Sequence, residues 1–367
     1  MTVSRLAVVG TGLIGASVAL AARRAGTAEV HAWDPDPDAL RAAVERGAVD
    51  VAAGGLAGAV EGADLVLVAA PVAVLPDEVR AVLEVADEAS IVTDVGSTKA
   101  AVCAAAGGDP RFIGGHPVSG SEARGAAHAT AELFDGATWF LTPVAATDAA
   151  RYGTLHAFVS SLRAVPVAVE PEAHDRIVAL TSHLPHALAN VLLNQTGAAP
   201  IDGHDPVASA GGSLRDMTRV AGANPRIWID IFLANAAPLL GALGEHRRRI
   251  EQLERALAAG DAGFLARWIA EAAGHRRRML AEAHADPGAL QRVRVHVPDR
   301  PGVLAGVTQA LGAARINIEE FDLQHFSADR GGVLTLTVAG ESEAARAAEL
   351  LEAQGYSAVV SPLLESD

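Results

Sequence analysis

The sequence predicts an α/β protein of three domains, because three patterns of apolar residues follow one another along its 367 residues. Short apolar strands alternate with alanine-rich helices over residues 1–168, which is typical of a largely parallel sheet covered by helices on both faces. Strand signals almost vanish over residues 169–286, where the apolar spacing is helical. Residues 291–367 show the element order β-α-β-β-α-β, in which residues 316–324 are predicted as the second strand.

The first domain should hold seven strands joined mostly by helices. Crossover connections of this kind are right-handed and favour parallel neighbours. Ligands of such sheets bind at the carboxyl ends of the strands, so polar residues that follow a strand are candidate site residues. The predicted strands cover residues 5–9, 29–33, 64–69, 91–94, 111–114, 138–142 and 164–169.

A glycine motif follows the first strand and opens the first helix. Gly10-Thr11-Gly12-Leu13-Ile14-Gly15 reads G-x-G-x-x-G, the fingerprint of a Rossmann-type dinucleotide-binding domain. Its glycines permit a tight turn, a close approach to a pyrophosphate, and close packing of helix on strand. The N–H groups at the helix start attract phosphate. We expect cofactor contacts at Gly10, Gly12, Leu13, Ile14 and Gly15. The alternative is a glycine-rich turn in another kind of α/β unit.

Asp34 narrows the choice of cofactor. It ends the second strand, where a carboxylate can accept hydrogen bonds from the ribose hydroxyls of NAD and would repel the extra phosphate of NADP. The sequence therefore predicts NAD. Pro71, after the third strand, and Ser97, after the fourth, are further expected cofactor contacts.

The composition limits the partners. The formal net charge is −15, so the chain should repel nucleic acid and anionic membranes, and an anionic substrate needs local cations. The single cysteine, Cys103, excludes an internal disulfide and fits a reducing compartment. The longest apolar run, Leu65–Leu75, is too short to span a bilayer, and the N-terminus does not resemble a signal peptide. We expect a cytoplasmic protein without a nucleic-acid or membrane partner.

Two polar residues follow neighbouring strands. Ser97 follows strand 91–94 and His116 follows strand 111–114, so both should lie at one edge of the sheet, facing the nicotinamide. A neutral imidazole there can accept a hydroxyl proton while hydride leaves the same carbon, and a serine can hydrogen-bond that hydroxyl. The alternatives are that Ser97 caps a helix that begins near Thr98, and that His116 is a turn histidine satisfied by backbone.

The helical domain carries two further pairs. His183 and His186 lie three apart on one helix face, but no adjacent carboxylate or cysteine completes a metal site, so we expect no metal. Arg215 and Arg219 are four apart and share a face, which fits a clamp for a substrate carboxylate; the alternative is a solvated or ion-paired surface. The apolar bulk of this domain exceeds what one small bundle needs, which predicts a homodimer.

Two segments of the third domain resemble the ACT domain, a small regulatory module that binds amino acids. They are Asp299-Arg300-Pro301-Gly302-Val303-Leu304 and Ile316-Asn317-Ile318. The resemblance implies an amino-acid effector. The effector-binding residues would be Asp299, Gly302, Val303, Leu304, Asn317 and Ile318.

Residues 3 to about 285 resemble the prephenate dehydrogenase family of tyrosine biosynthesis. After the glycine motif, five segments match in order: Asp94–Lys99, Gly114–Pro117, Ser182–His186, Arg215–Arg219 and Trp228–Phe232. The resemblance implies NAD-dependent oxidative decarboxylation of prephenate to 4-hydroxyphenylpyruvate. It further implies feedback regulation by tyrosine through the ACT domain.

The same resemblance implies roles for single residues. His116 would be the catalytic hydrogen-bond partner of the ring hydroxyl, with Ser97 in support. Arg219 would bind a substrate carboxylate and His186 would contact the substrate. The remaining implied substrate contacts are Arg215, Ser121 and Glu122, and Ser121 stands where the family often has a threonine.

Three other functions stay open. An arogenate dehydrogenase acts on a substrate with an amino group in place of the ketone, and His186 favours prephenate because an acidic residue would suit an ammonium better. A β-hydroxyacid dehydrogenase would need a lysine base, which is missing near residues 174–190. The third alternative is a catalytically silent sensor of NAD and amino acids, against which the joint presence of Ser97, His116 and Arg219 argues.

Overall fold

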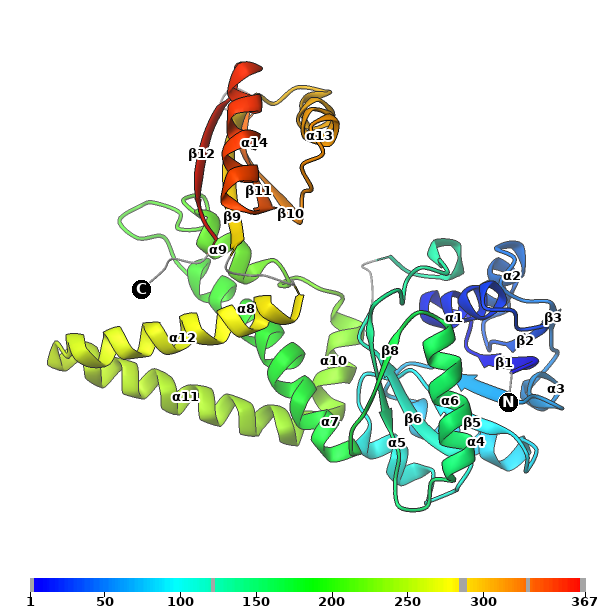
Figure 1. Cartoon of the computed structure of the whole chain (residues 1–367). Helices are drawn as coiled ribbons and strands as arrows, with labels where there is room; N and C mark the ends of the chain where they lie inside the picture. The colour runs from blue at the N-terminus through cyan, green and yellow to red at the C-terminus, as the bar shows by residue number, and fades with distance from the viewer. Residues whose placement is uncertain (1–2, 120–122, 284–288, 328–330, 364–367) are drawn as a thin grey trace. The chain divides into compact units, whose positions relative to one another are not determined.

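The computed structural model describes residues 3–119, 123–283, 289–327 and 331–363 (Figure 1). The chain divides into two compact units, Met1–Arg247 and Arg248–Asp367. The first unit holds a large sheet followed by helices, and the second holds a smaller antiparallel sheet.

The first unit is built on an eight-stranded sheet with the order β3-β2-β1-β4-β5-β6-β7-β8. The order of the first six strands is that of a dinucleotide-binding fold. All seven predicted strands are present; β3 has only two residues, too few for a recognisable pattern. The strands are β1 Arg5–Val9, β2 Glu29–Trp33, β3 Val51–Ala52, β4 Leu65–Val68, β5 Ile91–Asp94, β6 Phe112–Pro117, β7 Thr138–Thr142 and β8 Val165–Ala168.

The sheet is parallel except between β6 and β7. Each parallel neighbour is reached through a crossover helix, whereas the described part of the β6–β7 connection forms only the short 3₁₀ helix η1 (Ala126–His128). Without a crossover the chain returns in the opposite direction. The crossover helices are α1 Leu13–Arg24, α2 Pro37–Glu45, α3 Leu56–Val60, α4 Leu75–Val85, α5 Ala100–Ala105 and α6 Ala149–Ser161.

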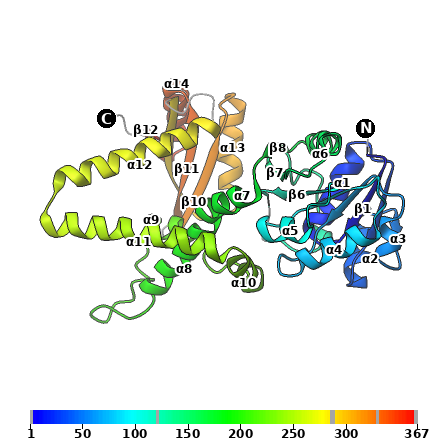
Figure 2. The same ribbon diagram turned by 90° about the horizontal axis from the view of Figure 1, so that it is seen from below.

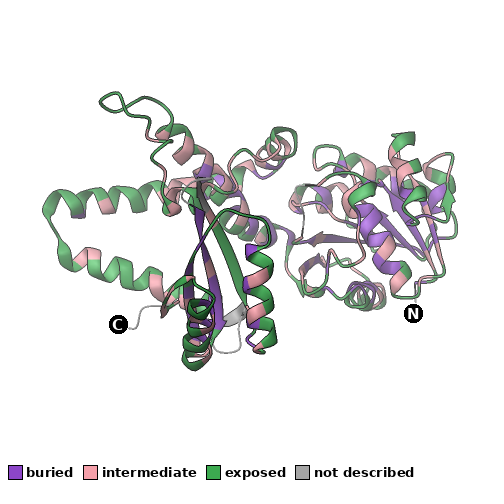
Figure 3. Cartoon of the chain, turned by 90° about the horizontal axis from the view of Figure 1, so that it is seen from above, coloured by how far each residue is buried: buried purple, intermediate pink, exposed green. Residues whose placement is uncertain are grey.

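Helices cover both faces of this sheet (Figures 1 and 2). Leu6 and Val8 of β1 pack in a cluster with residues of α1 and α6, whereas Ala7 and Val9 pack on the other face with residues of α3, α4 and α5. A strand buried on both faces needs a continuous apolar run, which is what β1 has. The inner strands are accordingly buried, whereas the outermost strands β3 and β8 are largely exposed and the helices expose their outer sides (Figure 3). Polar groups can therefore gather only at the ends of the strands.

The rest of the first unit is helical, as predicted, apart from an isolated bridge between Ile201 and His204. A single π-helical turn, η2, joins α7 to α8 without a break. Pro185 explains this turn, because proline has no N–H for the carbonyl one turn earlier and its ring crowds that group. The elements are α7 Pro171–Val178, η2 Ala179–His183, α8 Leu184–Thr196, α9 Gly212–Thr218, α10 Pro225–Ala234 and α11 Ala236–Ala259.

Among the described helices, no single one is long and apolar enough to cross a bilayer. Only α10 and α11 taken together have sufficient length and apolar composition, and they are bent by 87° where they meet.

The second unit contains the end of α11, then α12 (Ala262–Ala283) and a small α+β domain. The domain has a sheet of order β10-β11-β9-β12 in which every neighbouring pair is antiparallel. Side chains from the sheet and both helices share one core, so the predicted order β-α-β-β-α-β is confirmed. Its elements are β9 Leu290–Val297, α13 Val303–Ala313, β10 Glu320–Ser327, β11 Gly331–Ala339, α14 Glu341–Ala353 and β12 Ser357–Pro362.

Strand β10 begins at Glu320, four residues later than the predicted start at Ile316. The N–H of Ile316 instead donates to the carbonyl of Leu311 at 2.9 Å, and Arg315 adopts a left-handed φ of 58°. This is a Schellman-type helix end. The first residue of the predicted strand, Ile316, takes part in it, so the strand begins later.

Candidate active site

The glycine motif forms a cradle at the carboxyl end of β1. Gly10 has a φ of +95°, and a Cβ there would lie 2.5 Å from the carbonyl oxygen of Ala69. A Cβ on Gly15 would lie 2.0 Å from the carbonyl oxygen of Gly10, whereas at Gly12 nothing lies within 4 Å. Helix α1 starts without a side-chain cap, so its first N–H groups and the space at Gly12 fit a pyrophosphate. Pro71 lies two residues beyond Ala69, in the turn before α4.

Asp34 is fixed beside this cradle at the end of β2. Its Oδ2 accepts hydrogen bonds from the N–H (2.6 Å) and the hydroxyl (3.0 Å) of Thr11, and its Oδ1 accepts from the N–H of Asp36 (2.9 Å). Asp36 in turn accepts from the N–H of Asp38 at the start of α2. Three carboxylates thus follow one another at this edge, which suits ribose hydroxyls and disfavours a further phosphate.

Ser97 lies in the loop that follows β5 in the chain, and its buried Oγ has no hydrogen-bond partner among the described residues. It does not cap the next helix. Helix α5 begins at Ala100, and the N–H groups of Lys99 and Ala100 donate to the carboxylate of Asp175 at 2.7 and 2.9 Å. The capping alternative is therefore wrong. A buried hydroxyl without a partner is unfavourable, so Ser97 fits a contact with a bound cofactor or substrate.

His116 lies near the end of β6, and the peptide before it is held on both sides. The N–H of Gly115 donates to Oδ1 of Asp94 (3.0 Å), and its carbonyl accepts from Nζ of Lys99 (2.7 Å). Asp94 and Lys99 themselves form a fully buried ion pair. A Cβ on Gly115 would lie 2.5 Å from the carbonyl oxygen of Asp94, so this clamp requires a glycine directly before His116.

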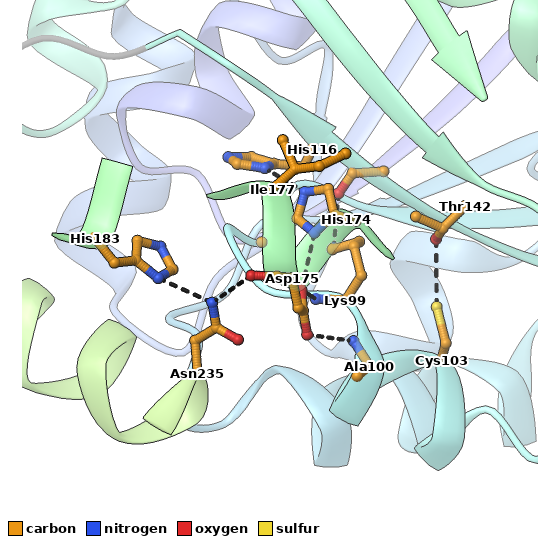
Figure 4. Close-up of polar contacts among 12 residues, drawn as sticks. Lys99, Ala100, Cys103, His116, Thr142, His174, Asp175, Ile177, His183 and Asn235 are labelled. Atoms are coloured by element: carbon orange, nitrogen blue, oxygen red, sulfur yellow. Dashed lines mark hydrogen bonds and ion pairs between the residues drawn. The ribbon is translucent and has the colours of Figure 1, made fainter. Parts of the chain in front are cut away.

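The imidazole of His116 is neutral at physiological pH. Burial lowers its pKa well below the ordinary 6.5, and the neighbouring His174, Lys99 and His183 lower it further. A neutral ring can accept a proton from a substrate hydroxyl. Its Nδ1 lies 2.8 Å from Nε2 of His174, so its described partner is a side chain and not turn backbone (Figure 4).

Four residues of the helical region complete this network, and none of them was among the predicted site residues. Nδ1 of His174, which is fully buried in α7, lies 2.8 Å from Oδ1 of Asp175. The side-chain amide of Asn235 donates to the backbone carbonyl of Asp175 (2.8 Å) and to Nδ1 of His183 (3.0 Å). Burial lowers the pKa of His183 to about 4. The adjacent His-Asp pair was visible in the sequence, but its contact with His116 arises only through packing.

His186 and Arg219 both belong to the helical part of the first unit. The ring of His186 stacks on Trp228 with centroids 3.5 Å apart, and its Nδ1–H donates to the carbonyl of Ser182 (3.0 Å). Burial lowers the pKa of His186, and the charge of Arg219 lowers it further, so that guanidinium lies nearby. Arg219 is exposed at the end of α9, and Arg215 is exposed one turn earlier.

Two predicted substrate contacts, Ser121 and Glu122, lie outside the described residues. Within the described ranges, no group of three or more His, Cys, Asp or Glu side chains is arranged to hold a metal ion.

The predicted effector residues do not meet within a single small domain. Residues 299–304 follow the end of β9, whereas Asn317 and Ile318 precede β10. Since β9 and β10 both run against β11, these segments lie at opposite ends of α13. Gly302, with a φ of +90°, precedes α13, and the side chain of Val303 is buried in the domain core. Leu304 is exposed, Asn317 donates to Glu319 at 2.7 Å, and Asp299 lies in the turn before Gly302.

The parallel sheet, its glycine cradle and the proton-handling groups at the same edge are those of a dinucleotide-dependent dehydrogenase. Three family models match the chain in order. They are the prephenate dehydrogenase nucleotide-binding domain at residues 18–168, the prephenate dehydrogenase dimerization domain at residues 170–271 and the ACT domain at residues 291–355. The chain belongs to the prephenate dehydrogenase family.

Individual relatives agree with this family. Prephenate dehydrogenase of Bacillus subtilis is 31% identical over 94% of this chain and 95% of its own length. The crystal structure of prephenate dehydrogenase from Aquifex aeolicus, in complex with hydroxyphenyl propionate and NAD+, has a TM-score of 0.70 at 27% identity, covering 76% of this chain and 99% of that one. Synechocystis arogenate dehydrogenase has a TM-score of 0.68 at 29% identity, covering 75% and 99%.

Proposed function

We propose that this protein catalyses the NAD-dependent oxidative decarboxylation of prephenate to 4-hydroxyphenylpyruvate. The observation that carries the proposal is the neutral imidazole of His116 at the sheet edge that also holds the glycine cradle and the unpaired hydroxyl of Ser97. Prephenate has a ring hydroxyl for such a base and two carboxylates for a cationic side chain. The Aquifex aeolicus relative was solved with NAD+ and a hydroxyphenyl compound, which supports the same pair of ligands here.

Each of the proposed site residues has a separate role in this reaction. His116 accepts the hydroxyl proton as the carbinol carbon becomes a carbonyl, and Ser97 hydrogen-bonds the same oxygen or holds the nicotinamide. Arg219 binds a substrate carboxylate and His186 contacts the substrate, and Arg215, Ser121 and Glu122 are proposed as further contacts. NAD, when bound, supplies the hydride acceptor. Loss of carbon dioxide then aromatises the ring, so the reaction needs neither a metal nor a covalent nucleophile.

NAD is proposed over NADP because of the acidic edge at Asp34. Asp34, Asp36 and Asp38 alternate with two prolines, and no cationic residue lies within this segment. A 2′-phosphate would meet these charges without a partner. The proposed cofactor contacts are Gly10, Gly12, Leu13, Ile14, Gly15, Asp34, Pro71 and Ser97.

Arogenate is the competing substrate, since a Synechocystis relative is an arogenate dehydrogenase. We favour prephenate because the proposed substrate contact is His186, whereas an acidic residue would suit the ammonium of arogenate better. Purified protein should be given NAD with either compound, and NADH should be followed by its absorbance. Faster turnover of prephenate is the expected result, and a much larger kcat/KM for arogenate would overturn the substrate choice.

We also propose a domain plan of residues 1–168, 169–286 and 291–367, with a homodimer built through the helical domain. The family model for residues 170–271 is called a dimerization domain, and Ile227, Leu233 and Leu240 are exposed apolar side chains there. Sedimentation at several concentrations should yield a dimer. The negative charge and single cysteine support a cytoplasmic location.

The ACT domain is proposed to bind an amino-acid effector, and the end product tyrosine is the expected one. The residues proposed for it lie at opposite ends of α13. Titration with tyrosine and with phenylalanine tests the choice. Inhibition by tyrosine alone supports it, and inhibition by phenylalanine alone contradicts it.

A further inference from the structure

A line of three side chains leads from α7 to His116 (Figure 4). Oδ1 of Asp175 lies 2.8 Å from Nδ1 of His174, and Nε2 of His174 lies 2.8 Å from Nδ1 of His116. His174 is fully buried and Asp175 nearly so. Both contacts are of hydrogen-bond length, so each must contain one proton.

Counting protons along this line fixes the tautomer of each ring. An ionised carboxylate can only accept, so Nδ1 of His174 carries the proton that it donates to Asp175. When the His174 ring carries only this one proton, its Nε2 has a lone pair and accepts from Nδ1–H of His116. His116, also neutral, is left with its lone pair on Nε2. That nitrogen is the one free for a substrate hydroxyl.

Asp175 is held as an anion in a fixed place. Its carboxylate accepts from the N–H groups of Lys99 and Ala100, and its carbonyl accepts from Asn235. Burial raises the pKa of this carboxyl, but the hydrogen bonds from His174, Ala100 and Lys99 outweigh it and leave the pKa below its usual range. Asp175 is therefore ionised, and hydrogen bonds hold it both to the start of α5 and to Asn235, which follows α10.

We propose that His174 and Asp175 are positioning residues that hold His116 in the tautomer with Nδ1 protonated and Nε2 available as the base. This inference rests on the proposed function, in which His116 accepts the hydroxyl proton. The pair acts only through His116 and touches neither substrate nor cofactor. It is a carboxylate–imidazole–imidazole arrangement that orients a base by the same logic as a catalytic triad.

Two substitutions at one position separate this role from simple packing. His174→Phe keeps a ring but has no acceptor, so Nδ1–H of His116 loses its partner. His174→Gln offers an amide oxygen that can still accept from it. His156→Phe is the matched control, because His156 is an exposed residue of α6 that lies outside the network.

The first readout does not need turnover. With ¹⁵N-labelled histidine, the ring nitrogens of His116 should report a protonated Nδ1 and an unprotonated Nε2 in the wild type and in H174Q. In H174F this pattern should be lost. A protonated Nε2 in the wild type, or a pattern unchanged by H174F, would overturn the proposal whether or not the protein turns over prephenate.

The second readout is kinetic and uses a double-mutant cycle. General base catalysis contributes about 10²- to 10⁴-fold, so H174F should lower kcat by roughly 10²-fold, and H174Q by much less. In an H116N background H174F should have no further effect, because the group it positions is gone. Additive losses would show a role independent of His116. An inactive wild type that has the expected tautomer would refute the proposed function and leave the positioning role intact.

Discussion

The ammonium of Lys99 donates to the carbonyl oxygen of Gly115 across 2.7 Å, directly before His116 in β6. Lys99 is the only lysine in the chain, and it is fully buried with Asp94 as its ionic partner. A compact ammonium can reach both groups at once, which a planar guanidinium cannot do in the same space. The strand that carries His116 is therefore tied to the loop that carries Ser97.

Replacing Lys99 by methionine should destabilise the fold by about 3–5 kcal/mol, because Asp94 would remain as an uncompensated buried charge. The free energy of unfolding in urea measures this. The double variant D94N/K99M is the control and should be less damaging, since no lone charge is left and an asparagine can still accept from Gly115. A loss below about 1 kcal/mol for K99M alone would contradict the clamp.

His116→Asn should lower kcat by roughly 10²- to 10⁴-fold, because asparagine cannot act as a base. NAD affinity, measured by quenching of tryptophan fluorescence, should stay close to that of the wild type. Near-normal turnover would remove His116 from the mechanism.

The pH profile should reflect the lowered pKa of His116. The base is active when neutral, and its pKa lies well below 6.5 because it is buried near His174, Lys99 and His183. Activity that depends on it is therefore retained as the pH falls through 6.5 and is lost only at lower pH. An acid limb of kcat/KM centred at or above pH 6.5, where an ordinary histidine titrates, would argue against a buried neutral base.

His183 should make folding stability depend on pH. Its pKa falls from 6.5 in the unfolded chain to about 4 in the fold, where burial disfavours the charged ring. The unfolded state thus binds more protons between these values, and stability decreases as the pH falls from 6.5 towards 4, by on the order of 3 kcal/mol. In His183→Asn, which keeps an acceptor for Asn235, the free energy of unfolding should change less over this range. Equal slopes in the two proteins would refute this assignment.

Asp34→Asn should shift the cofactor preference towards NADP by about tenfold or more, since a charge facing the 2′-phosphate is removed while the acceptor for Thr11 is kept. The ratio of kcat/KM for NAD and NADP measures it. Glu343→Gln is the matched control, because it also removes one surface carboxylate, here one paired with Arg346 on α14 of the small α+β domain. An unchanged ratio of kcat/KM in D34N would show that Asp34 does not determine the choice between NAD and NADP.

The sequence by itself determined the fold class and the residues that follow strands. Four site residues were recognisable because they lie at or shortly after the end of a strand, and parallel strands bring such positions to one edge of the sheet. They are Gly10, Asp34, Ser97 and His116. Local pattern also indicated the pair Arg215 and Arg219, but it could not tell which of them lies near His186.

Only the tertiary structure decided how His116 is held. His174 is 58 residues away from it, and Asp175 reaches the N–H of Lys99 across 76 residues. No local spacing encodes such contacts, because they form only when α7 packs against the sheet and places its buried side chains beside β6. The same holds for the unpaired hydroxyl of Ser97. A sequence shows that a serine is present, but the burial that leaves it without a partner is a property of the folded chain.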